Sequence, residues 1–393
     1  MRRILKKVIA LSIAICLGLG TVNVTCNNGI GRVNAEENNS ISATYFKKVS
    51  LKKKTLKLTW VKRSGIDGYE IQYGTSKSFK ESATKTVIVN KASTVEKTIK
   101  KIPQDKTYYY RIRTLKNVSE SIEDEEGNSI VEEKTVYSKW SRKVATIAYD
   151  KSWKYGSNSV IHSDVAVLYY AGEKKSNGIT VCVNAGHGTK GGSSKKTLCH
   201  PDGTAKVTGG STSKGAKYAT AVSGGTTLSD GTKEATANLD IAKKLKTVLL
   251  DEGYNVLLIR ESSDVQLDNV ARTVLANNNA DCHIAIHYDS TSSNKGAFYI
   301  SVPNVKSYRK MTPVKQNYKK HNKLGKALIK GMKDKKVKIF GQGSMAIDLT
   351  QTSYSTIPSV DVEVGDRASS HSSSQLDKIC KGILKGLNSY YDL

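Results

Sequence analysis

Four side chains in the C-terminal half are of types that bind a metal ion or transfer a proton: His187, Glu234, His287 and Glu363. His187, His287 and Glu363 lie at or near the predicted ends of buried strands, and Glu234 lies at the start of a predicted helix. Two histidines and one carboxylate that leave a fourth position open are typical of a catalytic zinc site. A further carboxylate nearby would supply a general base. These residue types therefore predict a zinc centre.

Spacing alone does not decide between this site and ordinary structural roles. His187, Glu234 and His287 are 47 and 53 residues apart, and no short H-E-x-x-H motif is present. A single His or Glu in a strand or helix is more often structural. We expect four other histidines in polar or loop contexts to be exposed to solvent: His162, His200, His321 and His371.

Strands that alternate with helices over residues 178–393 predict an α/β domain with a largely parallel sheet. The expected strands are 179–183, 255–259, 283–287, 297–302 and 360–364. The expected helices are 234–252, 267–277, 318–333 and 376–390. Sites in such sheets lie beyond the carboxyl ends of the strands. Glycines on both sides of His187 allow a tight turn there, and the dipole of a helix that begins at Glu234 favours an ionised carboxylate.

Residues 36–150 predict a separate all-β domain. Apolar residues alternate with polar ones over about seven short strands, as in a β-sandwich. The segment resembles a fibronectin type III domain, on the basis of Trp60, residues 68–71 and residues 107–113. The resemblance implies a buried Trp60 and a corner tyrosine at Tyr108. The segment contains no His or Cys, so we expect a spacer or a binding surface there and no catalysis.

Two further segments of the N-terminal half carry expectations. An acidic insertion at 120–133 would lengthen the loop between the last two strands of the sandwich. Residues 151–177 are expected to be a linker, with one apolar stretch at 165–170 that could form an edge strand of either domain.

The first 35 residues have the features of a secretory signal peptide. Four basic residues precede a short apolar run at 8–19, and Val33 and Ala35 are small residues at the positions a signal peptidase reads. The run is short for a transmembrane segment, although an uncleaved amphipathic anchor is the alternative. Four cysteines follow the signal peptide without a C-x-x-C pair, which argues against a cysteine zinc site and a disulfide scaffold.

The charge of the chain predicts an anionic partner. The formal net charge is +27, and the signal segment carries five basic and no acidic residues, which leaves +22 on the mature chain. Such an excess is typical of proteins that bind nucleic acid, a membrane surface or another anionic polymer. Export argues against nucleic acid, and we find no zinc-finger spacing, RNA-recognition signature or basic helical stripe. With no second apolar span, we expect no membrane anchor and a monomer that is soluble or wall-associated.

Residues 178–393 resemble the zinc-dependent N-acetylmuramoyl-L-alanine amidases of the type 3 family, which cut bacterial peptidoglycan. The resemblance is carried in order by residues 183–188, by 234 and 238–245, by 260–287, and by 357–365. It implies that His187, Glu234 and His287 bind one Zn²⁺ and that Glu363 is the catalytic carboxylate. It also implies a secreted peptidoglycan hydrolase that meets anionic cell-wall polymers. Arg272 matches an arginine of the family. We expect it to have a structural role or to contact the residues that bind the metal.

The chain departs from the family pattern at several positions. Asn184 stands where the family has Asp, and we expect it to orient a ligand histidine. Thr189 replaces a frequent Gly, and Asp366 replaces an aromatic residue. Residues 189–232 form a long insertion rich in Gly, Ser, Thr and Lys, either a substrate-side loop or a solvated insertion. Two other functions stay open: another zinc peptidase of the wall, or a wall-binding or adhesive protein without catalysis.

Overall fold

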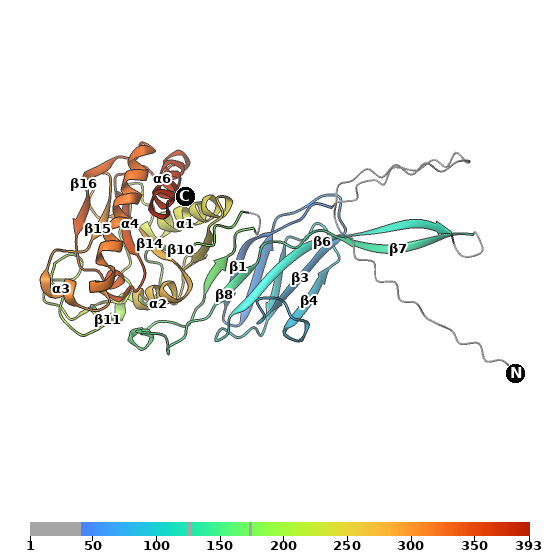
Figure 1. Cartoon of the computed structure of the whole chain (residues 1–393), viewed down its shortest axis with the longest axis horizontal. Coiled ribbons are helices and arrows are strands. Elements are labelled where there is room, and N and C mark those ends of the chain that lie inside the picture. The colour runs from blue at the N-terminus through green and yellow to red at the C-terminus, as the bar shows by residue number, and fades with distance from the viewer. Residues whose placement is uncertain (1–40, 124–127, 173–174) are drawn as a thin grey trace. The chain divides into compact units, whose positions relative to one another are not determined.

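The structure is a computed structural model that describes residues 41–123, 128–172 and 175–393 (Figure 1). The predicted signal peptide at 1–35 lies outside the described residues. Within those ranges, no helix has the length and apolar character needed to cross a membrane.

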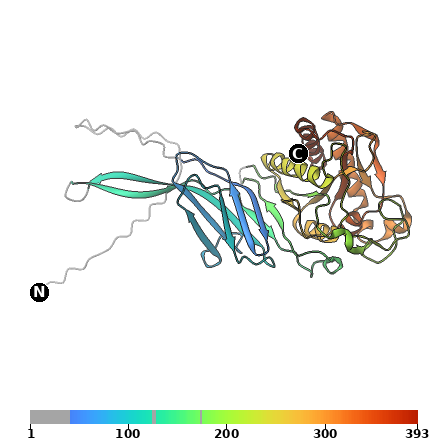
Figure 2. The ribbon, with the colours of Figure 1, turned by 180° about the vertical axis from the view of Figure 1, so that it is seen from behind.

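The N-terminal region of the described chain forms two antiparallel sheets (Figures 1 and 2). One has the order β1 (Phe46–Lys52), β2 (Thr55–Trp60), β5 (Glu96–Lys100). The other continues through β4 (Thr84–Val89), β3 (Gly68–Gly74), β6 (Tyr108–Glu123) and β8 (Val144–Ile147). Alternate apolar residues of both sheets share one core, in which Trp60 is 1% exposed and packs edge-to-face on Tyr69. The strands predicted over this segment and the buried Trp60 are confirmed.

The described parts of the acidic insertion are paired strands, which corrects the prediction that the segment only lengthens a loop. β6 runs on to Glu123 and pairs with β7 (Ser129–Tyr137), with Ile122 opposite Ile130. Ile122, Ile130 and Val131 are β-branched and favour an extended backbone, and each lies on one of these two strands. On β6 the buried tyrosine is Tyr110, whose hydroxyl lies 2.9 Å from that of Thr146, whereas the expected corner tyrosine Tyr108 is only partly buried.

The C-terminal domain is built on a mixed sheet, mainly parallel, as predicted. Its strands run in the order β16 (Ile339–Ala346), β15 (Ala297–Ser301), β17 (Ser359–Asp366), β14 (Cys282–Asp289), β10 (Thr180–Ala185), β13 (Asn255–Leu258). The strands β17, β14, β10 and β13 are parallel, and β15 is antiparallel to β17. The sequence analysis missed β16, in which glycine and glutamine interrupt the apolar pattern.

Helices cover both faces of this sheet (Figure 1). The longer ones are α1 (Glu234–Asp251), α2 (Asn269–Asn279), α4 (Val314–Asp334) and α6 (Ser373–Tyr391), and the shorter ones are α3 (Lys306–Lys310) and α5 (Thr350–Tyr354). Apolar residues of α1, α4 and α6 share a core with one face of the central strands, and those of α2 pack on the other. In α1, Leu239, Ala242, Leu245 and Leu249 are buried at intervals of three or four residues. The four long helices predicted from the sequence correspond to α1, α2, α4 and α6 and are confirmed.

The apolar stretch at 165–170 is not an edge strand. It forms β9 (Ala166–Tyr169), which pairs antiparallel with β13 on one side and with β8 on the other. All four residues are buried, and the sheets of the two regions therefore join into one twelve-stranded sheet within the described residues. The predicted linker at 151–177 thus contains a central strand of that sheet.

The insertion at 189–232 is folded against the domain. It contains a short hairpin of β11 (Lys196–Leu198) and β12 (Tyr218–Thr220). The carboxylate of the buried Asp348 lies 3.1 Å from His200 Nε2 and 2.9 Å from Lys206 Nζ. These contacts argue against a merely solvated insertion.

Two of the four histidines expected at the surface are buried. His200 is 1% exposed because it contacts Asp348, and His321 is 2% exposed because it lies on the inner face of α4. His321 Nδ1 accepts a hydrogen bond from the backbone N–H of Ser359. His162 and His371 are partly exposed.

Candidate metal centre

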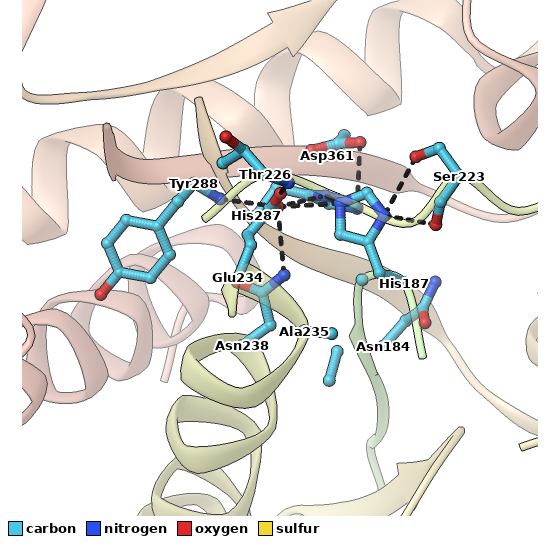
Figure 3. Close-up of polar contacts among 12 residues, drawn as sticks. Asn184, His187, Ser223, Thr226, Glu234, Ala235, Asn238, His287, Tyr288 and Asp361 are labelled. Carbon is cyan, nitrogen blue, oxygen red and sulfur yellow. Dashed lines mark hydrogen bonds and ion pairs between the residues drawn. The ribbon is translucent and has the colours of Figure 1, made fainter. Parts of the chain in front are cut away.

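Three of the four predicted side chains meet at one point beyond the sheet (Figure 3). His187 stands in the turn after β10, Glu234 is the first residue of α1, and His287 lies near the end of β14. A Cβ atom on Gly186 would come within 2.2 Å of the His287 ring, so only glycine allows the turn to pass there. His187 itself adopts a positive φ of 62°, which directs the turn toward α1 and β14.

The donor atoms of these side chains form a small triangle. Oε1 of Glu234 lies 2.9 Å from Nε2 of His187 and 3.1 Å from Nδ1 of His287, and the two ring nitrogens are 3.1 Å apart. Ligands around a tetrahedral zinc ion with bonds of about 2.0–2.1 Å are separated by about 3.3 Å. The triangle therefore fits three ligands of one zinc ion with a fourth position open.

The carboxylate of Glu234 is held in place by the backbone on both sides. Its Oε2 accepts a hydrogen bond from the N–H of Thr226 in the insertion, and its Oε1 accepts one from the N–H of Tyr288 on β14. The side-chain amide of Asn238, one turn along α1, also donates to Oε1. Burial raises the pKa of Glu234, but the hydrogen bonds from His187 and His287 outweigh it and hold that pKa well below its usual range.

The second nitrogen of each histidine also has a neighbour (Figure 3). Nδ1 of His187 lies 2.9 Å from the carbonyl oxygen of Ser223, in the insertion. Nε2 of His287 lies 3.7 Å from Oδ2 of Asp361, on β17. Such outer contacts fix the tautomer and the orientation of a ligand histidine. The insertion thus contributes to this centre, and a second carboxylate of β17 faces it.

Glu363 and Asp361 lie on the same side of β17, because side chains two residues apart in a strand point to the same face. Glu363 is in register with His287 on the neighbouring strand β14. Oε2 of Glu363 and Oδ1 of Asp361 are buried and have no hydrogen-bond partner within the described residues. Burial raises the pKa of Glu363 well above its usual value, and the nearby carboxylate of Asp361 adds to the shift. A carboxyl group in such surroundings can hold a proton and release it.

Carboxyl groups outnumber imidazole rings at this centre. Burial lowers the pKa of His287, but Asp361 and Glu234 outweigh it and raise that pKa to about 10. Three carboxyl groups therefore lie around two imidazole rings. The donor set of two ring nitrogens and one ionised carboxylate suits a divalent cation such as zinc.

Two arginines hold the turn that carries His187. Arg272, 1% exposed, donates to the carbonyl oxygen of His187 at 2.7 Å and to Oδ1 of Asn184 at 3.1 Å. Arg260 donates to the carbonyl oxygens of Ala185 and Gly186. Asn184 therefore contacts Arg272 and not a ligand histidine, which differs from the sequence expectation. Arg272 has the structural position that was expected of it.

The sequence analysis missed Asp361, Ser223 and Thr226. Asp361 could have been found, because it lies two residues before Glu363 in a predicted strand. Ser223 contacts Nδ1 of His187 through both its carbonyl oxygen and its hydroxyl, and Thr226 acts through its backbone N–H; nothing in the local sequence marks either position.

Comparison with known protein families places the C-terminal half of the chain. A sequence model for N-acetylmuramoyl-L-alanine amidases matches residues 181–389, more than half of the chain. The chain therefore belongs to the N-acetylmuramoyl-L-alanine amidase family, whose members hydrolyse an amide bond of peptidoglycan. No curated protein matches the chain.

Similar solved structures include amidases from several bacteria. Ami1 of Mycobacterium abscessus is 16% identical with a TM-score of 0.44, over 55% of this chain and 99% of that one. An amidase of Clostridium difficile is 19% identical with a TM-score of 0.38, over 55% and 98%. AmiC2 of Nostoc punctiforme is 18% identical with a TM-score of 0.37, over 54% and 99%.

Proposed function

We propose that the protein is a secreted, zinc-dependent amidase that hydrolyses the bond between N-acetylmuramic acid and the L-alanine of the stem peptide. The observation that carries the proposal is the triangle of His187, Glu234 and His287 beside the unpartnered carboxyl group of Glu363. Family membership supports the bond that is cut. One zinc ion per chain would be held by the three donor atoms.

The reaction needs a nucleophile and a proton carrier, because an amide is a poor electrophile and water is a poor nucleophile. A bound zinc ion lowers the pKa of water and polarises a carbonyl group. Glu363 takes the proton of the attacking water and returns it to the leaving amine of L-alanine. The bond between the lactyl carbonyl carbon and the nitrogen then breaks, the amine of L-alanine leaves with the returned proton, and the lactyl group of N-acetylmuramic acid keeps the oxygen of water as a carboxylate.

Asp361 is proposed as a positioning residue in this reaction. Its Oδ2 is the acceptor that faces Nε2 of His287, on the side of the ring away from the donor triangle. The negative charge of Asp361 at 3.7 Å favours a proton on Nε2, which leaves Nδ1 unprotonated and directed at the centre. The carbonyl oxygen of Ser223 has the same role for His187.

The remaining assignments concern the parts of the chain outside the centre. We propose a signal peptide at 1–35, a fibronectin type III-like domain at 36–150, a connecting segment at 151–177 and the amidase domain at 178–393. The strand order of the two N-terminal sheets supports the fibronectin type III-like domain. We expect the mature protein to act as a monomer at the cell wall and to associate with its anionic polymers.

Digestion of purified peptidoglycan with and without a chelator, followed by mass analysis of the products, tests the proposed function. An amidase releases stem peptides with a free L-alanine amine and leaves intact glycan, and the chelator abolishes this. Fragments cut within the stem peptide would instead identify another zinc peptidase. Wall binding without any released product, by protein that lacks zinc, would identify a protein without catalysis.

A further inference from the structure

Residues 304–338 concentrate the positive charge of the protein. They contain twelve Lys and one Arg, against one acidic residue, Asp334, which gives a net charge of +12. About a tenth of the mature chain thus carries more than half of its expected +22. The expectation that no basic helical stripe is present is wrong. The stripe is hard to see in the sequence, because buried apolar residues stand between the lysines.

The lysines of α4 lie on one exposed face of that helix. Leu324, Leu328 and Met332 are buried in the core, at intervals of four residues. The exposed lysines follow the opposite side: Lys315, Lys319, Lys320, Lys323, Lys326, Lys330 and Lys333. At 1.5 Å per residue, this face is about 27 Å long.

The face continues at its N-terminal end into a groove between α3 and α4. The groove has a volume of about 570 Å³ and is lined by five cationic residues and no acidic one. The cationic residues are Lys306, Arg309, Lys310, Lys315 and Lys319. None of them has an ion-pair partner in the described part of the chain.

Arg309 gives the groove a cation that is held in place. Its Nε donates to the carbonyl oxygen of Pro303 at 3.0 Å, and its Nη2 donates to that of Val302 at 3.3 Å. The guanidinium lies 4.8 Å from the centre of the Tyr318 ring. The groove therefore combines one immobilised guanidinium with four mobile ammonium groups.

We propose that this surface, the α3–α4 face of groove and helix lysines, binds an anionic polymer with repeating phosphodiester groups. A lysine ammonium is a compact point charge on a flexible stem, and it contacts phosphate without a fixed geometry. Many such charges along one line suit a flexible chain better than one small anion, because successive weak contacts add. That the polymer comes from the cell wall rests on the proposed function. The binding of a phosphodiester polymer to this face does not rest on it.

A membrane surface fits this face less well. Helices that lie on membranes bury an apolar face among the lipids. The apolar face of α4 is already covered by the core, and residues 304–338 expose no large hydrophobic side chain. This face can therefore bind a partner only through electrostatic attraction, and a flexible polyanion needs no other interaction.

The test compares two variants that each lose four charges. The groove variant carries Lys306→Gln, Lys310→Gln, Lys315→Gln and Lys319→Gln. The control variant carries Lys57→Gln, Lys85→Gln, Lys91→Gln and Lys106→Gln, all at exposed positions of the N-terminal sandwich. Binding of the full chain to immobilised linear inorganic polyphosphate is measured, together with binding to vesicles that contain anionic lipid.

We expect the groove variant to bind polyphosphate about ten-fold more weakly or worse, and the control variant to stay within about two-fold of the parent. An equal loss in both variants would overturn the proposal in favour of diffuse charge. Failure of the parent to bind polyphosphate, or tighter binding to vesicles, would overturn it as well. Hydrolysis of a short soluble muropeptide is measured in parallel, and its absence in the parent would count against the proposed function alone.

Discussion

The metal centre and the α3–α4 face use charged side chains in opposite ways. The centre collects His187, Glu234 and His287 from segments far apart in the chain, and each is held by hydrogen bonds to neighbouring elements. The α3–α4 face draws on one contiguous segment whose lysines are exposed and form no ion pair with another described residue. Function should therefore depend on the position of single atoms at the centre and on the number of charges on the face.

The largest expected effect comes from removing one donor atom of the triangle. His187→Ala leaves two ligands, so we expect loss of bound zinc and a fall in peptidoglycan hydrolysis of about 10³-fold or more. Zinc content by atomic absorption and release of stem peptides check this. His371→Ala is the matched control, because that histidine is partly exposed and its ring pairs with Asp230 and not with a residue of the triangle. A His187→Ala protein with full zinc content would remove His187 from the proposed site.

The second largest effect is expected from a variant that loses proton transfer but keeps metal binding. Glu363→Gln keeps the shape of the side chain but cannot accept the proton of water. We expect kcat to fall about 10²–10⁴-fold, with the zinc content unchanged. Activity close to that of the parent would show that another group is the base, and Asp361 would then be the first candidate.

Local patterns predicted the elements whose burial repeats at a short period. Helix α1 was found because Leu239, Ala242, Leu245 and Leu249 recur every three or four residues. The central position of β9 could not be predicted in this way, because its partners β8 and β13 are brought to it only by the fold. The burial of His200 likewise depends on Asp348, a distant residue with no mark in the local sequence.

The candidate site was predictable as a set of residue types and not as an arrangement. The residues named from the sequence as ligands do converge. Their supports could not be foreseen, since Thr226 acts through its backbone N–H and Ser223 is brought to His187 only by the fold of the insertion. The α3–α4 face differs from the site, because its residues come from one short segment of the sequence. The helix turns its lysines to one side and its apolar residues to the other.

A smaller effect is expected one contact away from the metal ligands. Asp361→Asn removes the negative charge beside Nε2 of His287 and keeps the size of the side chain. We expect the zinc affinity, measured by competition with a chelator, to fall about 10–100-fold. Asp289→Asn is the control, because that carboxylate lies on β14 and pairs with Lys295 instead. Equal zinc affinity in the Asp361→Asn variant and the parent would exclude the positioning role.

The smallest effect on catalysis is expected from salt, and it tests the comparison directly. Raising the ionic strength from about 0.1 to 1 M shortens the Debye length from about 10 to 3 Å, which screens exposed lysines far more than buried groups. Binding to intact walls should therefore weaken markedly, while hydrolysis of a short soluble muropeptide should change less than about two-fold. Sedimentation with walls and a muropeptide assay at the same salt concentrations measure the two. If both fell together, the charge of the face and the chemistry of the centre would not be separable, because substrate capture at the centre would then depend on the same exposed lysines.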